Sequence, residues 1–143
     1  MSHPRLQLLQ LSSHRLPVHT SVAPVFLSME VKRAAFKFSI LDRVEKLKEF
    51  LQENPADSFV QHALALEYIK AGDDGAAQKL FEDILQREPT YVGSYYHLAK
   101  LFERNGNNEA AVKWYEKGME EAKKAGENHS YNELRSAYEE LTF

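Results

Sequence analysis

The histidines are the side chains of this sequence best suited to acid-base chemistry or metal binding. They are His3, His14, His19, His62, His97 and His129. None belongs to an H-E-x-x-H sequence or to another spacing that would bring two ligands together on one helix face. His62 and His97 are expected on the first helices of two sequence repeats, which are described below. Their positions within the repeat differ by one residue, which argues against a repeated ligand pair. We therefore expect these side chains on the surface or in a groove, and we predict no metal site.

Adjacent acidic residues are the second candidate for chemistry. The pairs are Asp73 with Asp74, Glu82 with Asp83, Glu120 with Glu121, and Glu139 with Glu140. Neighbouring side chains on a helix point about 100° apart, so the two carboxylates of a pair do not converge on one bond. The chain has no cysteine, phosphate-binding glycine loop, nucleophile elbow or EF-hand loop. We predict that the protein is not an enzyme and uses no cofactor.

The overall composition is that of an ordinary globular protein. Of the 143 residues, 43% are hydrophobic and 27% are charged, and the formal net charge is -3. This charge and the lack of a basic block argue against a nucleic-acid partner, because phosphate binding requires clustered lysine and arginine. No apolar run approaches the roughly 18 residues of a membrane-spanning helix. We expect no membrane partner and a cytoplasmic location.

Residues 1–28 differ from the rest of the chain. They contain two arginines, three histidines and no acidic residue, whereas acids and bases are mixed from Glu30 onward. Three prolines are expected to interrupt any long helix in this segment. They are Pro4, Pro17 and Pro24.

Three interpretations of this segment stay open. The first is a disordered extension, and in this case the protein could also start at Met29. The second is a cleaved transit peptide, which would imply an organellar location. The third is an arm that packs on the domain. We assign residues 1–38 as a flexible N-terminal extension and residues 39–143 as the folded domain.

Two stretches of the sequence are similar to each other. Each residue of the first stretch has an equivalent in the second at a constant distance along the chain, as Leu64 has in Leu98, and we call this distance the repeat offset. The first contains Leu64, Ala65, Tyr68, Gly72, Ala77 and Phe81, and the second has Leu98, Ala99, Phe102, Gly106, Ala111 and Tyr115 at the same positions. The apolar residues of each copy follow helical spacing. Gly72 and Gly106 fit the left-handed residue that ends a helix, and the aspartates and asparagines after them can cap the next helix. Each copy is therefore predicted to be a helix, a tight turn and a second helix.

Two residues on the second helix of the second copy invite a functional interpretation. Trp114 would suit a binding hot spot, but it aligns with the apolar Leu80, which favours a role in helix packing. Gly118 lies inside the predicted helix, where we expect it to allow a close approach of helices and not to act as a hinge.

The repeat resembles the tetratricopeptide repeat family. That family's pattern places an aromatic, a leucine, a small residue and a second aromatic on one helix, then an alanine, a further aromatic and a proline, over about 34 residues. The first copy has Gln61 instead of the first aromatic, and the second has Lys123 instead of the proline. The resemblance covers about residues 40–141. It implies an all-α fold of antiparallel helical hairpins in a right-handed superhelical stack.

Partial units are predicted on both sides of the two full repeats. The units are partial at 40–55, full at about 58–91 and 92–125, and partial at 131–141. Ser39 precedes the first helix, and Ser130 with Glu133 forms a capping box before the last one. Polar residues should close the stack on the outer side of the last helix, namely Asn132, Arg135, Glu139 and Glu140. We predict about six helices, near residues 40–53, 58–71, 74–87, 92–104, 108–124 and 131–141.

The last predicted helix repeats the spacing of the first helix of the second copy. Tyr131, Leu134 and Tyr138 correspond to Tyr95, Leu98 and Phe102. This offset, called the terminal offset below, is two residues longer than the repeat offset, as if two residues were inserted before the last helix. The helix is therefore expected to be the first helix of a third unit.

The first helix of the first repeat carries two apolar stripes. One stripe, which includes Leu64, faces the repeat core, whereas Phe59, Leu66 and Ile69 form a second stripe on another face. Two apolar faces require two partners. The second stripe is either open, as part of a groove, or covered from within by residues 34–40 or the helix that follows them.

By its resemblance to the tetratricopeptide repeats, the chain is expected to hold a peptide or helix in a concave groove formed by the first helices of successive units. The lining would be Phe59, His62, Leu66, Ile69, Tyr96, Lys100 and Glu103. One subset of the family grips acidic chaperone tails through lysine and asparagine on these helices, but here His62 and Leu66 stand at the first two of those positions. The groove is therefore predicted to be apolar with a polar end, suited to a hydrophobic segment or an amphipathic helix.

The predicted function is that of a non-catalytic protein-interaction adaptor whose partner is another protein. Two alternatives remain. The chain is a self-associating assembly module that forms homo-oligomers, or it is a regulatory subunit of a larger enzyme complex.

Overall fold

The computed structural model describes the backbone of residues 3–143 and the side chains of residues 28–143. Over this range the chain forms six α-helices. They are α1 (His3–Glu53), α2 (Ser58–Lys70), α3 (Asp74–Arg87), α4 (Gly93–Arg104), α5 (Asn108–Ala125) and α6 (Asn128–Thr142). The chain divides into two compact units, Met1–Ser39 and Ile40–Phe143. The predicted all-α fold is confirmed.

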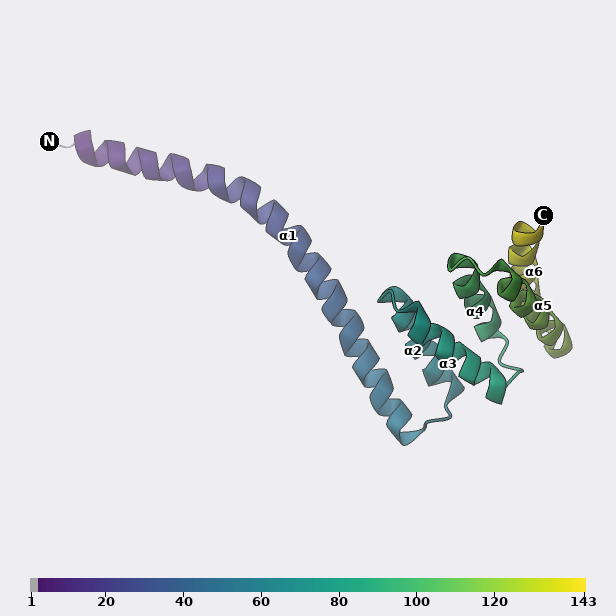
Figure 1. Ribbon diagram of the computed structural model, residues 1–143. Helices are drawn as coiled ribbons and strands as arrows, with labels where there is room; N and C mark the ends of the chain where they lie inside the picture. Colours follow the sequence, from purple (N-terminus) through teal and green to yellow (C-terminus); the bar gives the residue numbers. More distant parts are fainter. Residues whose placement is uncertain (1–2) are drawn as a thin grey trace. The chain divides into compact units, whose positions relative to one another are not determined.

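The second unit is built from consecutive helical hairpins. Figure 1 shows α2 followed by α3, and α4 followed by α5, each pair joined by a tight turn, with α6 after them. The start and end of each of these five helices lie within three residues of the predicted bounds. The repeat offset in the sequence is therefore an offset of one hairpin in the structure.

The turns of the two hairpins repeat the same backbone geometry. Gly72 and Gly106 have φ angles of 82° and 84°, the left-handed conformation that a glycine adopts without strain. The next residue in each turn caps the following helix through its side-chain oxygen. The cap bonds run from Ala76 N to Asp73 Oδ1 at 3.1 Å and from Ala110 N to Asn107 Oδ1 at 3.2 Å. Both predicted turns and both predicted caps are confirmed.

The core consists of the small and aromatic residues that recur in both copies of the repeat. Phe81 and Tyr115 are fully buried, and so are the alanines one turn before them. Alanines on the first helices are buried in the same way, because only a small side chain lets the two helices of a hairpin approach each other. These alanines are Ala65, Ala77, Ala99 and Ala111.

Gln61, which replaces the first aromatic of the repeat, keeps the same hydrogen bond as its aromatic counterpart. Tyr95 Oη donates to the carbonyl of Pro89 at 2.6 Å, and Gln61 Nε2 donates to the carbonyl of Pro55 at 3.3 Å. Gln61 Oε1 also accepts a bond of 2.6 Å from Arg87 Nη2. The amide therefore replaces the polar end of the tyrosine, although it lacks the bulk of the ring.

The first helix starts far earlier than predicted. α1 begins at His3, so the expectations that the prolines interrupt any long helix and that the first helix starts near residue 40 are wrong. Residues 29–39 contain no glycine or proline, so no helix-breaking residue lies just before Ile40, and Ser39 lies inside the helix. Residues 1–38 are predicted to be a flexible extension. The structure describes side chains only from residue 28 onward, and the predicted flexibility stays a prediction.

The last helix also begins earlier than predicted, and the predicted capping box is wrong. Gly126, with a φ of 72°, turns the chain at the end of α5, and the next helix starts at Asn128. Ser130 therefore lies within the first turn of α6, where its backbone is already helical. Its hydroxyl donates to Glu127 Oε2 at 3.2 Å instead of accepting a bond from the backbone.

Both ends of the second unit carry an arginine where the full repeats carry a buried alanine. Arg135 of α6 aligns with Ala99 by the terminal offset, and its side chain is 58% exposed. Arg43 of α1 aligns with Ala77 by the repeat offset, and its Nε atom lies 3.1 Å from Glu67 Oε1. A long charged side chain at these positions ends the close packing of helices, as expected for terminal units.

The segment of α1 within the second unit packs on α2. Ile40 and Val44 are buried against Leu64, and Leu47 and Leu51 contact the same cluster.

In the part of the chain that the structure describes, no helix has both the length and the apolar character needed to cross a membrane.

Candidate functional site

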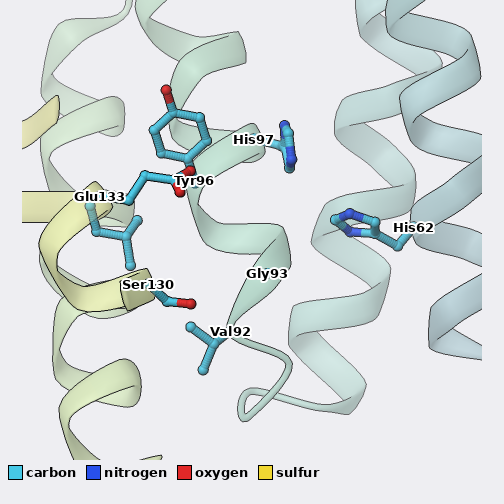
Figure 2. Close-up of a pocket in the computed structure, with 8 residues that line it drawn as sticks. His62, Val92, Gly93, Tyr96, His97, Ser130 and Glu133 are labelled. Carbon is cyan, nitrogen blue, oxygen red and sulfur yellow. The ribbon is translucent and has the colours of Figure 1, made fainter. Parts of the chain in front are cut away.

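The first helices of the units, α2, α4 and α6, together line a cavity of about 230 Å³. Its lining residues are His62, Val92, Gly93, Tyr96, His97, Ser130, Glu133 and Leu134. Figure 2 shows α4 between the other two helices, with His62 pointing toward His97 from one side and Glu133 pointing toward Tyr96 from the other. Three helices that are distant in sequence therefore contribute side chains to one site.

The repeat positions explain why these side chains meet. His62 and Tyr96 are equivalent under the repeat offset. His97 and Glu133 are equivalent under the terminal offset, which relates α4 to α6. Because equivalent helices lie side by side in a stacked array, equivalent positions form rows across it, here one row through His62 and Tyr96 and a neighbouring row through His97 and Glu133.

Two histidines, one from each of these neighbouring rows, lie next to each other in the cavity. The ring centroids of His62 and His97 are 5.4 Å apart. Phe81 lies beneath both, at 5.4 Å from His62 and stacked at 5.9 Å from His97. The Nδ1 atom of His62 is 2.9 Å from the hydroxyl oxygen of the fully buried Ser94. The imidazoles are thus held in fixed positions by aromatic and polar contacts.

Burial keeps both imidazoles neutral. It lowers the pKa of His62 to about 4, and the neighbouring His97 contributes to the same shift. Burial also lowers the pKa of His97, although Glu133 acts in the opposite direction. At neutral pH the pair therefore offers hydrogen-bonding nitrogens and ring surface, but no positive charge.

The other predicted lining residues of α4 form a linked polar group. Lys100 lies over the ring of Tyr96, with Nζ 5.8 Å from the ring centroid. It also forms an ion pair with Glu103 at 3.5 Å. Glu103 Oε2 accepts a hydrogen bond of 2.8 Å from the hydroxyl of the buried Tyr115, and this bond fixes the carboxylate against the core.

The predicted apolar stripe on α2 does not enter the cavity. Leu66 and Ile69 are partly buried against the main core, whereas the side chain of Phe59 is 74% exposed. Of the predicted lining, the structure therefore brings His62 and Tyr96 together in the cavity, and it places the apolar stripe elsewhere on α2. The helix segment from Ile40 onward packs on the face of α2 that carries Leu64, not on this stripe.

Six contributors to the cavity are absent from the predicted lining, namely Val92, Gly93, His97, Ser130, Glu133 and Leu134. His97 was discounted because it is out of phase with His62, yet neighbouring helices bring successive positions close together. Glu133 is equivalent to His97 by the terminal offset, but its spacing from Ser130 predicts a capping role for it. By alignment with the predicted lining of α2 and α4, α6 would contribute Asn132, Ser136 and Glu139, so the repeat positions alone do not select His97 or Glu133.

The arrangement offers binding groups more than catalytic ones. Among the residues whose side chains the structure describes, no group of three or more histidine or acidic side chains is placed to hold a metal ion. The cavity combines the phenol ring of Tyr96, two neutral imidazoles, the hydroxyl of Ser130 and one carboxylate, which suits hydrogen bonding and packing around a side chain of another molecule.

Comparison with known proteins identifies the repeat. The sequence profile of the tetratricopeptide repeat matches residues 68–137. A tetratricopeptide repeat domain protein from Salinibacter ruber, known from its crystal structure, is 38% identical, with a TM-score of 0.58 over 59% of this chain and 94% of that chain.

Two curated relatives are longer proteins. Human tetratricopeptide repeat protein 7A is 30% identical over 86 residues, which are 60% of this chain and 10% of the relative. Mouse interferon-induced protein with tetratricopeptide repeats 3 is 24% identical over 76 residues, which are 53% of this chain and 19% of the relative. The chain thus spans a tenth and about a fifth of these two proteins.

The Salinibacter domain is matched over nearly its whole length, and the repeat profile covers both helices of the second hairpin. The turns, the caps and the buried alanines recur at the spacing that is typical of the family. The chain belongs to the tetratricopeptide repeat family.

Proposed function

We propose that this chain is a non-catalytic interaction module that binds a peptide or helical segment of another protein in the groove formed by α2, α4 and α6. Tetratricopeptide repeat domains are generally protein-interaction modules and are typically non-catalytic. The observation that supports the proposal most directly is the cavity lined by side chains from all three first helices. Its two histidines are held in place before a ligand arrives, so ordering them on binding costs little conformational entropy.

The test is a selection of random dodecapeptides, displayed on phage, against the full-length protein. The best selected peptide is then synthesised with a fluorescent label, and its dissociation constant is measured by fluorescence anisotropy. Replacement of Tyr96 by alanine should weaken binding roughly tenfold or more, because an aromatic side chain in a binding groove contributes on the order of 2 kcal/mol.

Lys113→Ala is the matched control. Lys113 lies on α5, its side chain is 74% exposed, and it does not line the cavity. This change should leave the dissociation constant unaltered. If peptides are selected whose binding depends equally on both positions, or on neither, the groove is not the binding site.

Self-association is the second candidate, and exposed aromatic side chains on α1 favour it. Phe36 and Phe38 are 59% and 74% exposed, and large exposed apolar groups commonly mark an interaction surface. Size-exclusion chromatography with light scattering distinguishes the two functions. A dimer at low micromolar concentration that Phe38→Ser converts to a monomer would support self-association, and a monomeric wild-type protein would exclude it.

A further inference from the structure

The charge inside the cavity comes from α6. At neutral pH, Glu133 carries the one full charge among the described lining residues, because the lining is otherwise aromatic, apolar, hydroxylic or made of neutral imidazole. Its side chain is 46% exposed, so the carboxylate remains accessible from solvent. His129, one turn earlier on α6, lies 3.7 Å away and is 96% exposed, which makes it a weak and well-hydrated neighbour.

The lysine of α4 does not offset this charge. Lys100 is paired with Glu103, whose carboxylate is also held by Tyr115. The positive charge of Lys100 is therefore compensated within the protein. Among the described residues that line the cavity, none carries a positive charge to compensate Glu133.

The uncharged part of the lining also suits a cation. The face of an aromatic ring attracts a positive charge, and the ring of Tyr96 already has one ammonium group near it. A neutral imidazole has one nitrogen that accepts a hydrogen bond, and two imidazoles lie side by side here. The walls thus offer acceptors and ring faces to a cationic group, while Val92 and Leu134 can contact its aliphatic stem.

Building on the function proposed above, we propose that this cavity binds a lysine or arginine side chain of the partner polypeptide, with Glu133 as its counter-ion and Tyr96 against its stem or head group. The bound segment would carry this basic residue among apolar ones. An acidic peptide is disfavoured, because its carboxylates would approach Glu133 while the lysine and asparagine that grip acidic tails are replaced by His62 and Leu66.

The composition of the peptides selected against the full-length protein provides the first test. Lysine or arginine should be enriched at one position of the aligned peptides. The labelled peptide that binds best should then bind Glu133→Gln roughly five- to tenfold more weakly than the wild-type protein, because a charge-assisted hydrogen bond is replaced by a neutral one. The same peptide with that basic residue changed to glutamine should show little difference between the two proteins.

Glu109→Gln is the matched control, since it removes the same charge from α5 at a side chain that is 86% exposed. It should leave binding unchanged. Circular dichroism should confirm that Glu133→Gln and the wild-type protein unfold at the same temperature.

The outcomes separate this inference from the proposed function. If binding is lost in Tyr96→Ala but not in Glu133→Gln, or if acidic residues are enriched, the groove binds peptides but the basic pocket is wrong. If neither change affects the selected peptides, the groove itself is wrong, and the inference falls with it.

Discussion

Among single residues, Gly118 shows most directly how closely the helices pack. A Cβ atom at this position would lie 2.6 Å from Tyr95 Cβ and 3.0 Å from Leu134 Cδ1. Tyr95 and Leu134 are themselves 0% and 1% exposed, so neither side chain has free space into which to move. Gly118 therefore marks the point where α5 contacts both α4 and α6, and its interpretation as a close-packing residue is confirmed.

Replacement of Gly118 by alanine should destabilise the protein. Overpacking a core costs typically about 1 to 3 kcal/mol, and the better helix propensity of alanine returns at most about 1 kcal/mol. We expect the free energy of unfolding in urea to fall by roughly 1 to 2 kcal/mol.

Gly75→Ala is the control for this change, because a Cβ there would lie 3.9 Å from Asp73 Oδ1, an ordinary contact. Its stability should be unchanged or slightly raised by helix propensity. Equal losses in the two variants would mean that the contact with Tyr95 is not the cause.

At the scale of the helices, the turns and caps are set by local sequence. Asn107 accepts a hydrogen bond from the backbone of α5, whereas Ser130, which also precedes apolar residues, lies inside α6 and caps nothing. The difference comes from the distance to the preceding glycine, because α5 and α6 each start at the second residue after Gly106 and Gly126. Asn107 directly follows its glycine and therefore stands before its helix, but Ser130 comes after the helix has begun.

These two residues give opposite predictions for the same kind of substitution. Asn107→Ala should lower the free energy of unfolding by about 1 kcal/mol, because an unsatisfied N–H is left at the start of α5. Ser130→Ala should change it by less than about 0.5 kcal/mol, since only an exposed bond to Glu127 is lost. Urea unfolding curves measure both values. A larger loss in Ser130→Ala than in Asn107→Ala would restore the predicted capping box.

Much of the fold could be predicted because each repeat position has one physical task. Alanine, aromatic and glycine recur at the repeat offset, so they fix the hairpins and turns without reference to the rest of the chain. Gln61 breaks the pattern by residue type but keeps the hydrogen bond to the carbonyl before α2, which a comparison of ring sizes misses.

The start of α1 and the site were harder to predict. The sequence predicts a helix start at Ser39 because this serine precedes helically spaced apolar residues from Ile40 onward, but a serine does not by itself end a helix, and α1 runs through it. The cavity is formed by three helices. The sequence of one helix does not show which of its side chains lie near the other two. His97 and Glu133 were therefore missed although their positions in the repeat were known.

At the scale of the whole domain, the two histidines connect the first repeat to the second. His62 belongs to α2 and His97 to α4, and both pack on Phe81 from α3. Their protonation therefore affects the interface between repeats and not one hairpin alone. Because a repeat array is stabilised by contacts between neighbouring units, a charge at this interface weakens the array as a whole.

The domain should accordingly lose stability in mild acid. The folded protein lowers the pKa of His62 to about 4, against about 6.5 for an exposed histidine. Between these values the unfolded chain binds more protons than the folded one, so stability is full above about pH 6.5 and falls as the pH drops toward 4. The ring is partly exposed, so we expect the loss from this residue to be on the order of 1 kcal/mol.

The experiment compares wild-type protein with His62→Gln by urea unfolding at pH 7 and at pH 4.5. Carboxylates titrate in both proteins, so only the difference between their pH dependences reports on His62. The variant should lose less stability than the wild-type protein on acidification. His129→Gln, which changes a 96% exposed ring, should behave like the wild-type protein. If His62→Gln is as acid-sensitive as the wild-type protein, burial of a neutral imidazole between the repeats is not what limits the domain at low pH.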